Sequence, residues 1–206
     1  MTKARMWAVA AVVTAGATAA CVLWIDRRLA ECIDETAWHT GFAVGLNAGL
    51  GVLRPLVVAA MLILFWSGWV RMRGGRPAAW MRLPLLLSWS VMWRLGAEVV
   101  LKTAFGRGWP DPTYLREGQY GFRWLHGVTY WNSFPSGTAL IAGAIAGVVW
   151  VERERWRWAV GATAGALWVA LVLSNDHWLA DVIAGAFLGV TVGWMTVLLQ
   201  GRAVAD

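Results

Sequence analysis

The sequence predicts an all-α integral membrane protein, a bundle of six transmembrane helices that forms a single domain over residues 1–206. Three observations lead to this prediction. Hydrophobic residues make up 59% of the chain and charged residues only 15%, against about a quarter charged in soluble domains. Six apolar runs approach the roughly 20 residues that a membrane span needs. The 17 tryptophans suit anchoring at several membrane interfaces.

The six apolar runs cover about residues 6–25, 51–70, 84–105, 135–151, 158–174 and 178–199. Each is expected to be helical, because lipid offers no hydrogen bonds to an exposed backbone. The first run resembles a signal peptide in having small residues before Cys21, but it stays apolar through Ile25, so we predict a membrane helix. Cys21 and Cys32 are too few for a disulfide framework and lack the spacing of a metal site.

The distribution of Lys and Arg predicts the orientation. With six spans both termini share one side, where ten basic residues fall, against six on the other side. The ten are Lys3, Arg5, Arg71, Arg73, Arg76, Arg82, Arg153, Arg155, Arg157 and Arg202; the six are Arg27, Arg28, Lys102, Arg107, Arg116 and Arg123. Basic loops stay in the cytoplasm, so both termini are predicted to be cytoplasmic, in a membrane expected to be a bacterial inner membrane. The net charge of +6 is then a topology signal, and no nucleic-acid partner is predicted.

Two long connections fall on the outer side. Residues 26–50 are mixed in character and have room for a short interfacial helix. Residues 106–134 are rich in aromatic side chains, which suits a surface at the level of the lipid headgroups.

Ionisable residues inside the spans are costly and are therefore candidates for function. Arg94, Glu98 and Lys102 are spaced four residues apart on the third helix, so they share one face. They form either a self-neutralising ion ladder or, with Lys102 at the outer end, part of a binding site. Arg54 lies near the outer end of the second helix, where it either snorkels to the interface or assists the site.

Three polar clusters converge on the outer side. Lys102 and Arg107 follow the third helix, Ser136 precedes the fourth, and His177 and Asp181 open the sixth at a spacing of four. Taken singly, a helix N-cap explains Ser136 equally well. Together, cations, a helix N-terminus with free N–H groups and an imidazole oriented by a carboxylate suit a phosphoryl group. No carboxylate cluster accompanies them, so neither a metal nor another cofactor is predicted.

The clusters read KTAFGRGWP at 102–110, FPSGT at 134–138 and LSNDHWLADVIAG at 173–185. In order and spacing they resemble the type 2 phosphatidic acid phosphatase superfamily of integral membrane lipid phosphatases. Its signature is Lys-x6-Arg-Pro, Pro-Ser-Gly-His and Ser-Arg-x5-His-x3-Asp. The resemblance covers about residues 84–200, and it implies a six-helix bundle and hydrolysis of a lipid phosphate through a phosphohistidine.

The resemblance assigns roles to individual residues. His177 matches the nucleophile and Asp181 its orienting partner. Lys102 matches a phosphate-binding cation, and Ser136 with Gly137 matches the phosphate cradle. Arg107 and Thr138 are further candidates for binding the substrate. The substrate would be a lipid phosphate or an isoprenoid diphosphate within the membrane.

The chain also departs from the signature. The arginine of the first motif falls on Trp109, and the second-motif histidine, which protonates the leaving group, falls on Thr138. The Ser-Arg pair of the third motif falls on Ala170 and Leu171. Loss of a general acid typically costs about 10²–10⁴-fold in rate.

Other basic residues are candidates for compensation, and three functions stay open. Arg107 and Arg54 are candidates to replace a missing arginine, and His126 in the long outer loop is a candidate acid. The first function is a divergent phosphatase of lipid phosphates or diphosphates. The second is a catalytically impaired pseudo-phosphatase that binds lipid phosphate or serves as a membrane partner subunit or homo-oligomer. The third is a transporter that uses the ion ladder, although neither repeated halves nor broken helices are evident.

Overall fold

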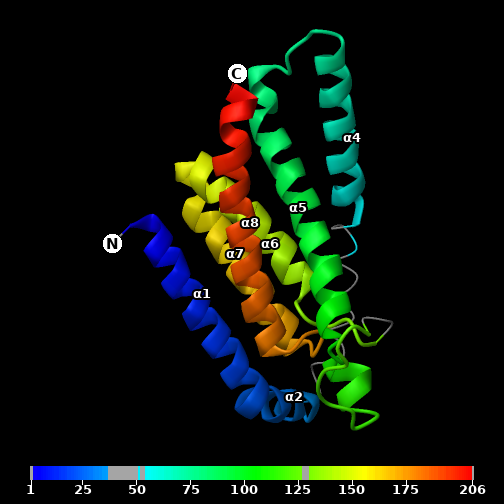
Figure 1. The fold of residues 1–206 in the computed structure, drawn as a ribbon. Coiled ribbons are helices and arrows are strands. Elements are labelled where there is room, and N and C mark those ends of the chain that lie inside the picture. Colours follow the sequence, from blue (N-terminus) through cyan, green and yellow to red (C-terminus); the bar gives the residue numbers. More distant parts are fainter. Residues whose placement is uncertain (1, 37–50, 52–53, 127–129, 206) are drawn as a thin grey trace.

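The computed structural model describes residues 2–36, 51, 54–126 and 130–205, which form helices joined by loops (Figure 1). The principal helices are α1 (Lys3–Ala20), α2 (Asp26–Asp34), α4 (Arg54–Met72), α5 (Arg82–Phe105), α6 (Gly137–Glu152), α7 (Arg157–Leu173) and α8 (Leu179–Ala205). Each of the six predicted apolar runs therefore contains a helix in its described residues. A short helix, α2, lies in the connection where an interfacial helix was predicted, and residues 37–50 of that connection lie outside the described residues.

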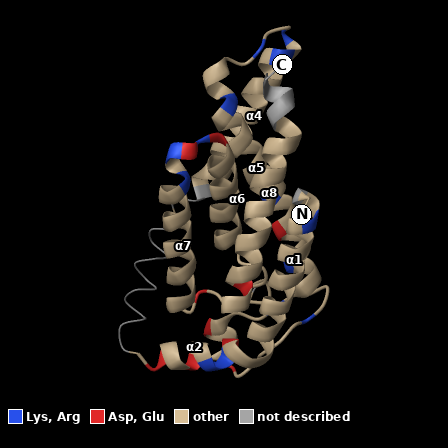
Figure 2. Cartoon of the chain, turned by 90° about the vertical axis from the view of Figure 1, so that its left-hand side faces the viewer, with Lys and Arg blue, Asp and Glu red and all other residues tan. Residues whose placement is uncertain are grey.

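The predicted number of six spans is supported only in part. Within the described residues, five helical stretches are long and apolar enough to cross a membrane: Ala4–Asp34, Pro55–Met72, Ala79–Phe105, Glu154–Leu173 and Leu179–Gln200. The helix of the fourth predicted run, α6, has 16 residues and is shorter than these five stretches. Most charged residues gather at the two ends of the bundle, with long uncharged stretches of helix between them (Figure 2).

The first two helices meet at a bend. A π-helical turn, Cys21–Ile25, joins α1 to α2, and α2 lies across the end of the bundle where α5 ends and α6 and α8 begin (Figure 1). We call this end of the molecule the α2 end. The C-terminus of the chain lies at the opposite end of the bundle.

Glycines allow α6 and α8 to pack backbone to backbone. Gly143 and Gly147 of α6 face Gly185, Gly189 and Gly193 of α8, each at a spacing of four residues. A Cβ atom on any of them would overlap a backbone oxygen of the other helix. Small residues at such spacing are typical of closely packed membrane helices. This contact places the first residues of α6 beside the first turn of α8.

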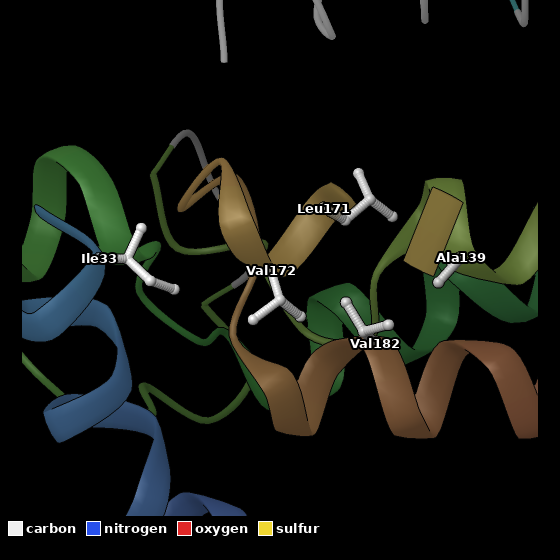
Figure 3. Packing of buried hydrophobic residues seen from close by; sticks show 5 residues of the cluster. All are labelled: Ile33, Ala139, Leu171, Val172 and Val182. Atoms are coloured by element: carbon white, nitrogen blue, oxygen red, sulfur yellow. The ribbon is translucent and has the colours of Figure 1, made fainter. Parts of the chain in front are cut away.

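An apolar cluster holds several helix ends together at the α2 end. Ile33 of α2 is buried with Ala139 of α6, Leu171 and Val172 of α7, and Val182 of α8 (Figure 3). Burial of each large side chain contributes about 1.5–3 kcal/mol. The cluster therefore attaches α2 to α6, α7 and α8.

Candidate active site

Three helix ends meet at the α2 end. Lys102 lies in the last turn of α5, Ser136 caps α6, His177 lies in the turn just before α8, and Asp181 lies in the first turn of α8. The backbone N–H of Ser136 donates to the carbonyl oxygen of Asp181 over 3.1 Å. The predicted convergence of α6 and α8 is therefore direct, through a backbone hydrogen bond between the second and third motifs.

The histidine and its partner carboxylate are both buried. His177 is 5% exposed and Asp181 is 0% exposed. His177 Nδ1 lies 3.7 Å from Asp181 Oδ2, an ion-pair distance that is too long for a hydrogen bond. Among the described residues Nδ1 has no hydrogen-bond partner. The carboxylate faces Nδ1, so the other ring nitrogen, Nε2, is the one available for attack on phosphorus.

Arg107 holds Asp181 from behind. The Arg107 guanidinium is 0% exposed and donates to Asp181 Oδ1 over 2.5 Å and to Asp26 Oδ2 over 2.6 Å. Its NH2 group also lies 3.1 Å from the hydroxyl of Tyr120. Ser133 donates a further hydrogen bond to Asp181 Oδ2. Both oxygens of Asp181 are therefore occupied by donors that do not face a substrate.

The charge of this buried arginine is secured by its partners. Burial alone would lower the pKa of Arg107, but the carboxylates of Asp181 and Asp26 outweigh burial and raise it above its ordinary value. The guanidinium also lies over the rings of Phe122 and Trp178, at 5.2 and 5.1 Å from their centroids. Arg107 is thus permanently charged, and it holds the Asp181 carboxylate in position.

A glycine allows the chain to reach this position. Gly106 ends α5 in the left-handed region, with φ +50°, and its N–H donates to Lys102 O over 3.0 Å. A Cβ there would overlap the carbonyl oxygen of Arg123. This tight C-cap directs the chain back under the helix, so that Arg107 points inward while Lys102 stays on α5.

The predicted ion ladder on α5 is present. Arg94 donates to Glu98 Oε2, and Lys102 Nζ lies 3.2 Å from Glu98 Oε1. Arg94 is buried, whereas the side chains of Glu98 and Lys102 keep 16% and 18% exposure. The ladder begins inside the span and ends at the α2 end, beside the start of α6.

An aromatic residue occupies the place of the first-motif arginine. The ring of Trp109 lies 4.7 Å from that of His177, centroid to centroid, at 34°. Lys102 Nζ is 5.8 Å from the Trp109 centroid, within range of a cation–π contact. Trp109 Nε1 donates to Asn132 Oδ1 over 2.8 Å. Trp109 thus lies between the candidate nucleophile and the candidate phosphate-binding lysine.

The other predicted residues have different surroundings. Ser136 is 0% exposed, and its hydroxyl accepts from the Ala139 N–H over 3.2 Å, which is the interaction of an N-cap. Thr138 is half-buried in the first turn of α6. His126 is exposed on the loop. Arg54 begins α4, but its side chain lies outside the described part of the chain.

Leu171 explains one departure from the signature. It is 1% exposed and packs in the apolar cluster of Figure 3, between α7 and α6. A leucine at this position stabilises the helix interface, and an arginine there would need space and partners that the cluster does not offer.

Asp26 is a site residue that the sequence analysis missed. It is 1% exposed, pairs with Arg107, and accepts from the Ala180 N–H of α8 over 3.2 Å. Its signal in the sequence is weak, since it is simply the acidic residue that ends the first apolar run. Ser133 and Tyr120 were missed as well, because polar residues in a long loop carry no spacing that identifies a partner. In the described part of the chain, no group of three or more His, Cys, Asp or Glu side chains has the arrangement of a metal site.

An apolar groove runs from the site region along the helices. It has a volume of about 550 Å³ and lies between α1, the end of α5 and α8. Thr18, Leu101, Phe105, Phe134 and Phe187 are among its lining residues. Leu101 and Phe134 are close in sequence to Lys102 and Ser136, so the groove begins near the polar cluster.

Comparisons with known proteins agree with this arrangement. The profile of the PAP2 superfamily matches residues 83–205. A lipid A 1-phosphatase of Rhizobium johnstonii is 31% identical over 105 residues, 50% of this chain and 42% of the relative. One of Rhizobium etli is 34% identical over 101 residues, 48% of this chain and 41% of the relative. The matched part thus spans about two fifths of the length of these relatives.

A solved structure shares the fold. It is the crystal structure of a transmembrane PAP2-type phosphatidylglycerolphosphate phosphatase from Bacillus subtilis. The TM-score is 0.52 at 13% identity, with 95% of this chain and 96% of the other covered. At this identity the likeness shows the fold alone. The profile match over more than half of the chain confirms the family resemblance that the motifs indicated.

Proposed function

We propose that this chain, which belongs to the PAP2 superfamily, hydrolyses a lipid phosphate or diphosphate at the outer membrane face through a phosphohistidine at His177. The observation that carries the proposal is the buried imidazole whose Nδ1 faces Asp181 at 3.7 Å, beside the N-terminus of α6. A nucleophilic histidine needs a partner that fixes its tautomer and stabilises its positive charge. Asp181 meets this need, because Arg107 and Ser133 hold it in place.

The reaction follows from these positions. His177 Nε2 attacks phosphorus, and the bond from phosphorus to the leaving-group oxygen breaks, so that the phosphoryl group is carried on the imidazole. Water then cleaves the P–N bond and releases inorganic phosphate. Lys102 and the free N–H groups at the start of α6, at Gly137 and Thr138, stabilise the charge on the phosphoryl oxygens. Arg107 acts from behind Asp181 and does not touch the substrate in this scheme.

The leaving group sets the substrate preference. Thr138 occupies the place of the family's proton donor, and threonine does not supply a proton to an alkoxide efficiently. When the terminal phosphoryl group of a lipid diphosphate is transferred, the leaving group is the lipid monophosphate, which needs less protonation than an alkoxide. We therefore expect diphosphates, or monophosphates with acidic leaving groups, to react faster than simple alkyl phosphates.

The lipid portion has a place to lie. The apolar groove between α1, α5 and α8 begins near the polar cluster and suits an acyl or isoprenoid chain. The curated relatives carry the name lipid A 1-phosphatase, so anionic lipids with a phosphate on the headgroup are the class to test first.

The outer location rests on the ten-to-six excess of basic residues on the side of both termini. Single cysteines introduced at Glu117 and at Gly75, in a background without Cys21 and Cys32, test it. A membrane-impermeant thiol reagent applied to intact cells is expected to label position 117 and to spare position 75. Labelling of both positions, or of position 75 alone, contradicts the orientation.

Phosphate release by the purified chain, assayed on a panel of lipid phosphates and diphosphates, tests the reaction. His177→Ala is expected to abolish release, because it removes the nucleophile. The matched control is His126→Ala. His126 lies exposed on the loop, so we do not expect it to act as the proton donor, and this variant is expected to keep wild-type activity. Release that persists in His177→Ala, or that is absent from wild type on every lipid, rejects the enzymatic function.

A second candidate function is a pseudo-phosphatase that binds lipid phosphate without turnover. One observation favours it: the ring of Trp109 lies on His177, where the family has a phosphate-binding arginine. Binding of lipid phosphate that weakens in Lys102→Ala, together with no phosphate release, distinguishes this function from the first.

A further inference from the structure

The ion ladder on α5 ends against the start of α6. The Glu98 carboxylate lies so close to Gly137 that a Cβ atom there would overlap its Oε1 and crowd its Oε2. Gly137 is the first residue of α6, directly after the N-cap Ser136. Figure 1 shows α5 and α6 side by side at this level. A carboxylate of the chain itself therefore lies against the first residue of α6, beside the helix N-terminus that the motif assigns to phosphate.

Two cations hold this carboxylate. Arg94 donates to Glu98 Oε2, and Lys102 Nζ lies 3.2 Å from Oε1. Arg94 is 7% exposed, and its Nε has no hydrogen-bond partner among the described residues. A buried guanidinium with an unused donor has capacity for an acceptor besides Glu98.

Two cations beside a helix N-terminus make an anion site. The cluster carries two positive charges from Arg94 and Lys102 and one negative charge from Glu98, so a single positive charge remains. A phosphate dianion would leave the cluster with one excess negative charge while Glu98 stays, and would balance the two cations once Glu98 withdraws. The carboxylate and a phosphate thus compete for the same donors.

We propose that Glu98 is a resident anion in the phosphate site, and that Arg94 and Lys102 are the pair of cations that binds phosphate when Glu98 withdraws. The inference rests on the proposed function, because it places the substrate phosphate at the start of α6. It gives Arg94 the phosphate-binding role of the signature arginines, which are replaced here by Trp109 and Leu171. The second cation then comes from the interior of α5, two turns before Lys102.

The inference predicts how a change at Glu98 alters the affinity of the site for phosphate. Removing the charge of Glu98 removes a competitor from the site, so phosphate binds more tightly. Two like charges held by the same donors repel, and relaxation and salt reduce this repulsion without removing it. An increase in affinity of about tenfold or more is therefore expected for Glu98→Gln. A purely structural ion pair predicts the opposite, because loss of one partner disturbs the site.

The experiment measures binding of inorganic phosphate to the purified full-length chain in detergent, by titration calorimetry, with a thermal melt of each variant. Glu98→Gln is expected to tighten binding about tenfold or more, and Arg94→Gln to weaken it by a similar factor. The matched control is Glu152→Gln, since Glu152 pairs with Arg82 away from the α2 end. This variant is expected to bind phosphate as wild type does.

If Arg94→Gln does not fold, Arg94→Lys keeps the charge and is expected to bind phosphate more weakly than wild type, since it lacks the planar fork. Unchanged or weaker binding in folded Glu98→Gln overturns the inference. So does wild-type affinity in the folded Arg94 variant.

The outcomes separate this inference from the proposed function. Tighter phosphate binding in Glu98→Gln without any lipid-phosphate hydrolysis by wild type supports the resident anion and rejects the enzyme. Hydrolysis by wild type with phosphate affinity insensitive to both Glu98 and Arg94 supports the enzyme and rejects the resident anion.

Discussion

Replacing Arg107 by methionine is expected to cost about 3–5 kcal/mol of unfolding free energy, because removal of one partner from a buried ion pair leaves uncompensated charge. The geometry places this case at the severe end. Arg107, Asp26 and Asp181 are all at most 1% exposed, and the guanidinium separates the two carboxylates. Arg107→Met leaves two buried negative charges with no cation between them.

The expected change is large enough to measure. For chains of 150–250 residues, 1 kcal/mol shifts Tm by about 2–4 °C, so Arg107→Met is expected to lower Tm by about 6–20 °C. The assay is thermal unfolding of the purified chain in detergent, followed by tryptophan fluorescence. Arg116→Met is the matched control, since Arg116 pairs with Asp34 and Asp111 at the surface, where its side chain is 54% exposed. An exposed pair contributes about 0–1 kcal/mol.

A second substitution tests the cause of the loss. Asp26→Asn alone leaves Arg107 paired with Asp181 and is expected to be milder than Arg107→Met. Combined with Arg107→Met it removes one of the two uncompensated carboxylates, so the double variant is expected to be more stable than Arg107→Met. A coupling of about 0.5–3 kcal/mol is typical of residues in contact. If Arg107→Met melts like Arg116→Met, or if Asp26→Asn adds its full cost to that of Arg107→Met, the charge argument is refuted.

Two further predictions concern the reaction and the packing. Thr138→His is expected to raise phosphate release from monophosphate esters more than from diphosphates, because only the alkoxide needs a proton; an equal effect on both substrates would contradict the leaving-group argument. Gly189→Leu is expected to separate α6 from α8 and to lower Tm by several degrees, since its Cβ would overlap the Leu140 carbonyl. Gly165→Leu on α7, where a Cβ meets nothing within 4 Å, is its control and is expected to leave Tm close to wild type.

The sequence was sufficient for those features that arise from local spacing. Apolar runs located the helices, and a spacing of four residues placed Arg94, Glu98 and Lys102 on one face, as the ion pairs of α5 now show. A helix converts sequence distance into spatial distance by a fixed rule, so the contacts along α5 are predictable without a fold. His177 and Asp181 also lie at an ion-pair distance, but His177 belongs to the turn before α8, so helix geometry alone does not set that contact.

Contacts between distant segments were not predictable in this way. Asp26 and Arg107 are 81 residues apart, and their pairing depends on the π-helical bend after α1 and on the tight C-cap of α5. Neither feature leaves a periodic signal in the sequence. The resting position of Glu98 against Gly137 likewise depends on how closely α5 approaches α6. The inward direction of Arg107 follows from the C-cap of α5. From the motif alone, Arg107 was a candidate for binding phosphate.

The charges of the site offer a physical reason for the departure from the motif at Trp109. An arginine at position 109 would lie beside His177 and close to Lys102. Arg94, which pairs with Glu98, already contributes a buried positive charge to this region. A further cation there would disfavour the imidazolium that the proposed attack of His177 on phosphorus requires. Tryptophan avoids this repulsion and contacts the imidazole at a tilt of 34° instead. In this interpretation the phosphate-binding charge that the family has in the loop, at position 109, is supplied here by Arg94 in the interior of α5. As a consequence, Glu98 occupies the site until phosphate displaces it.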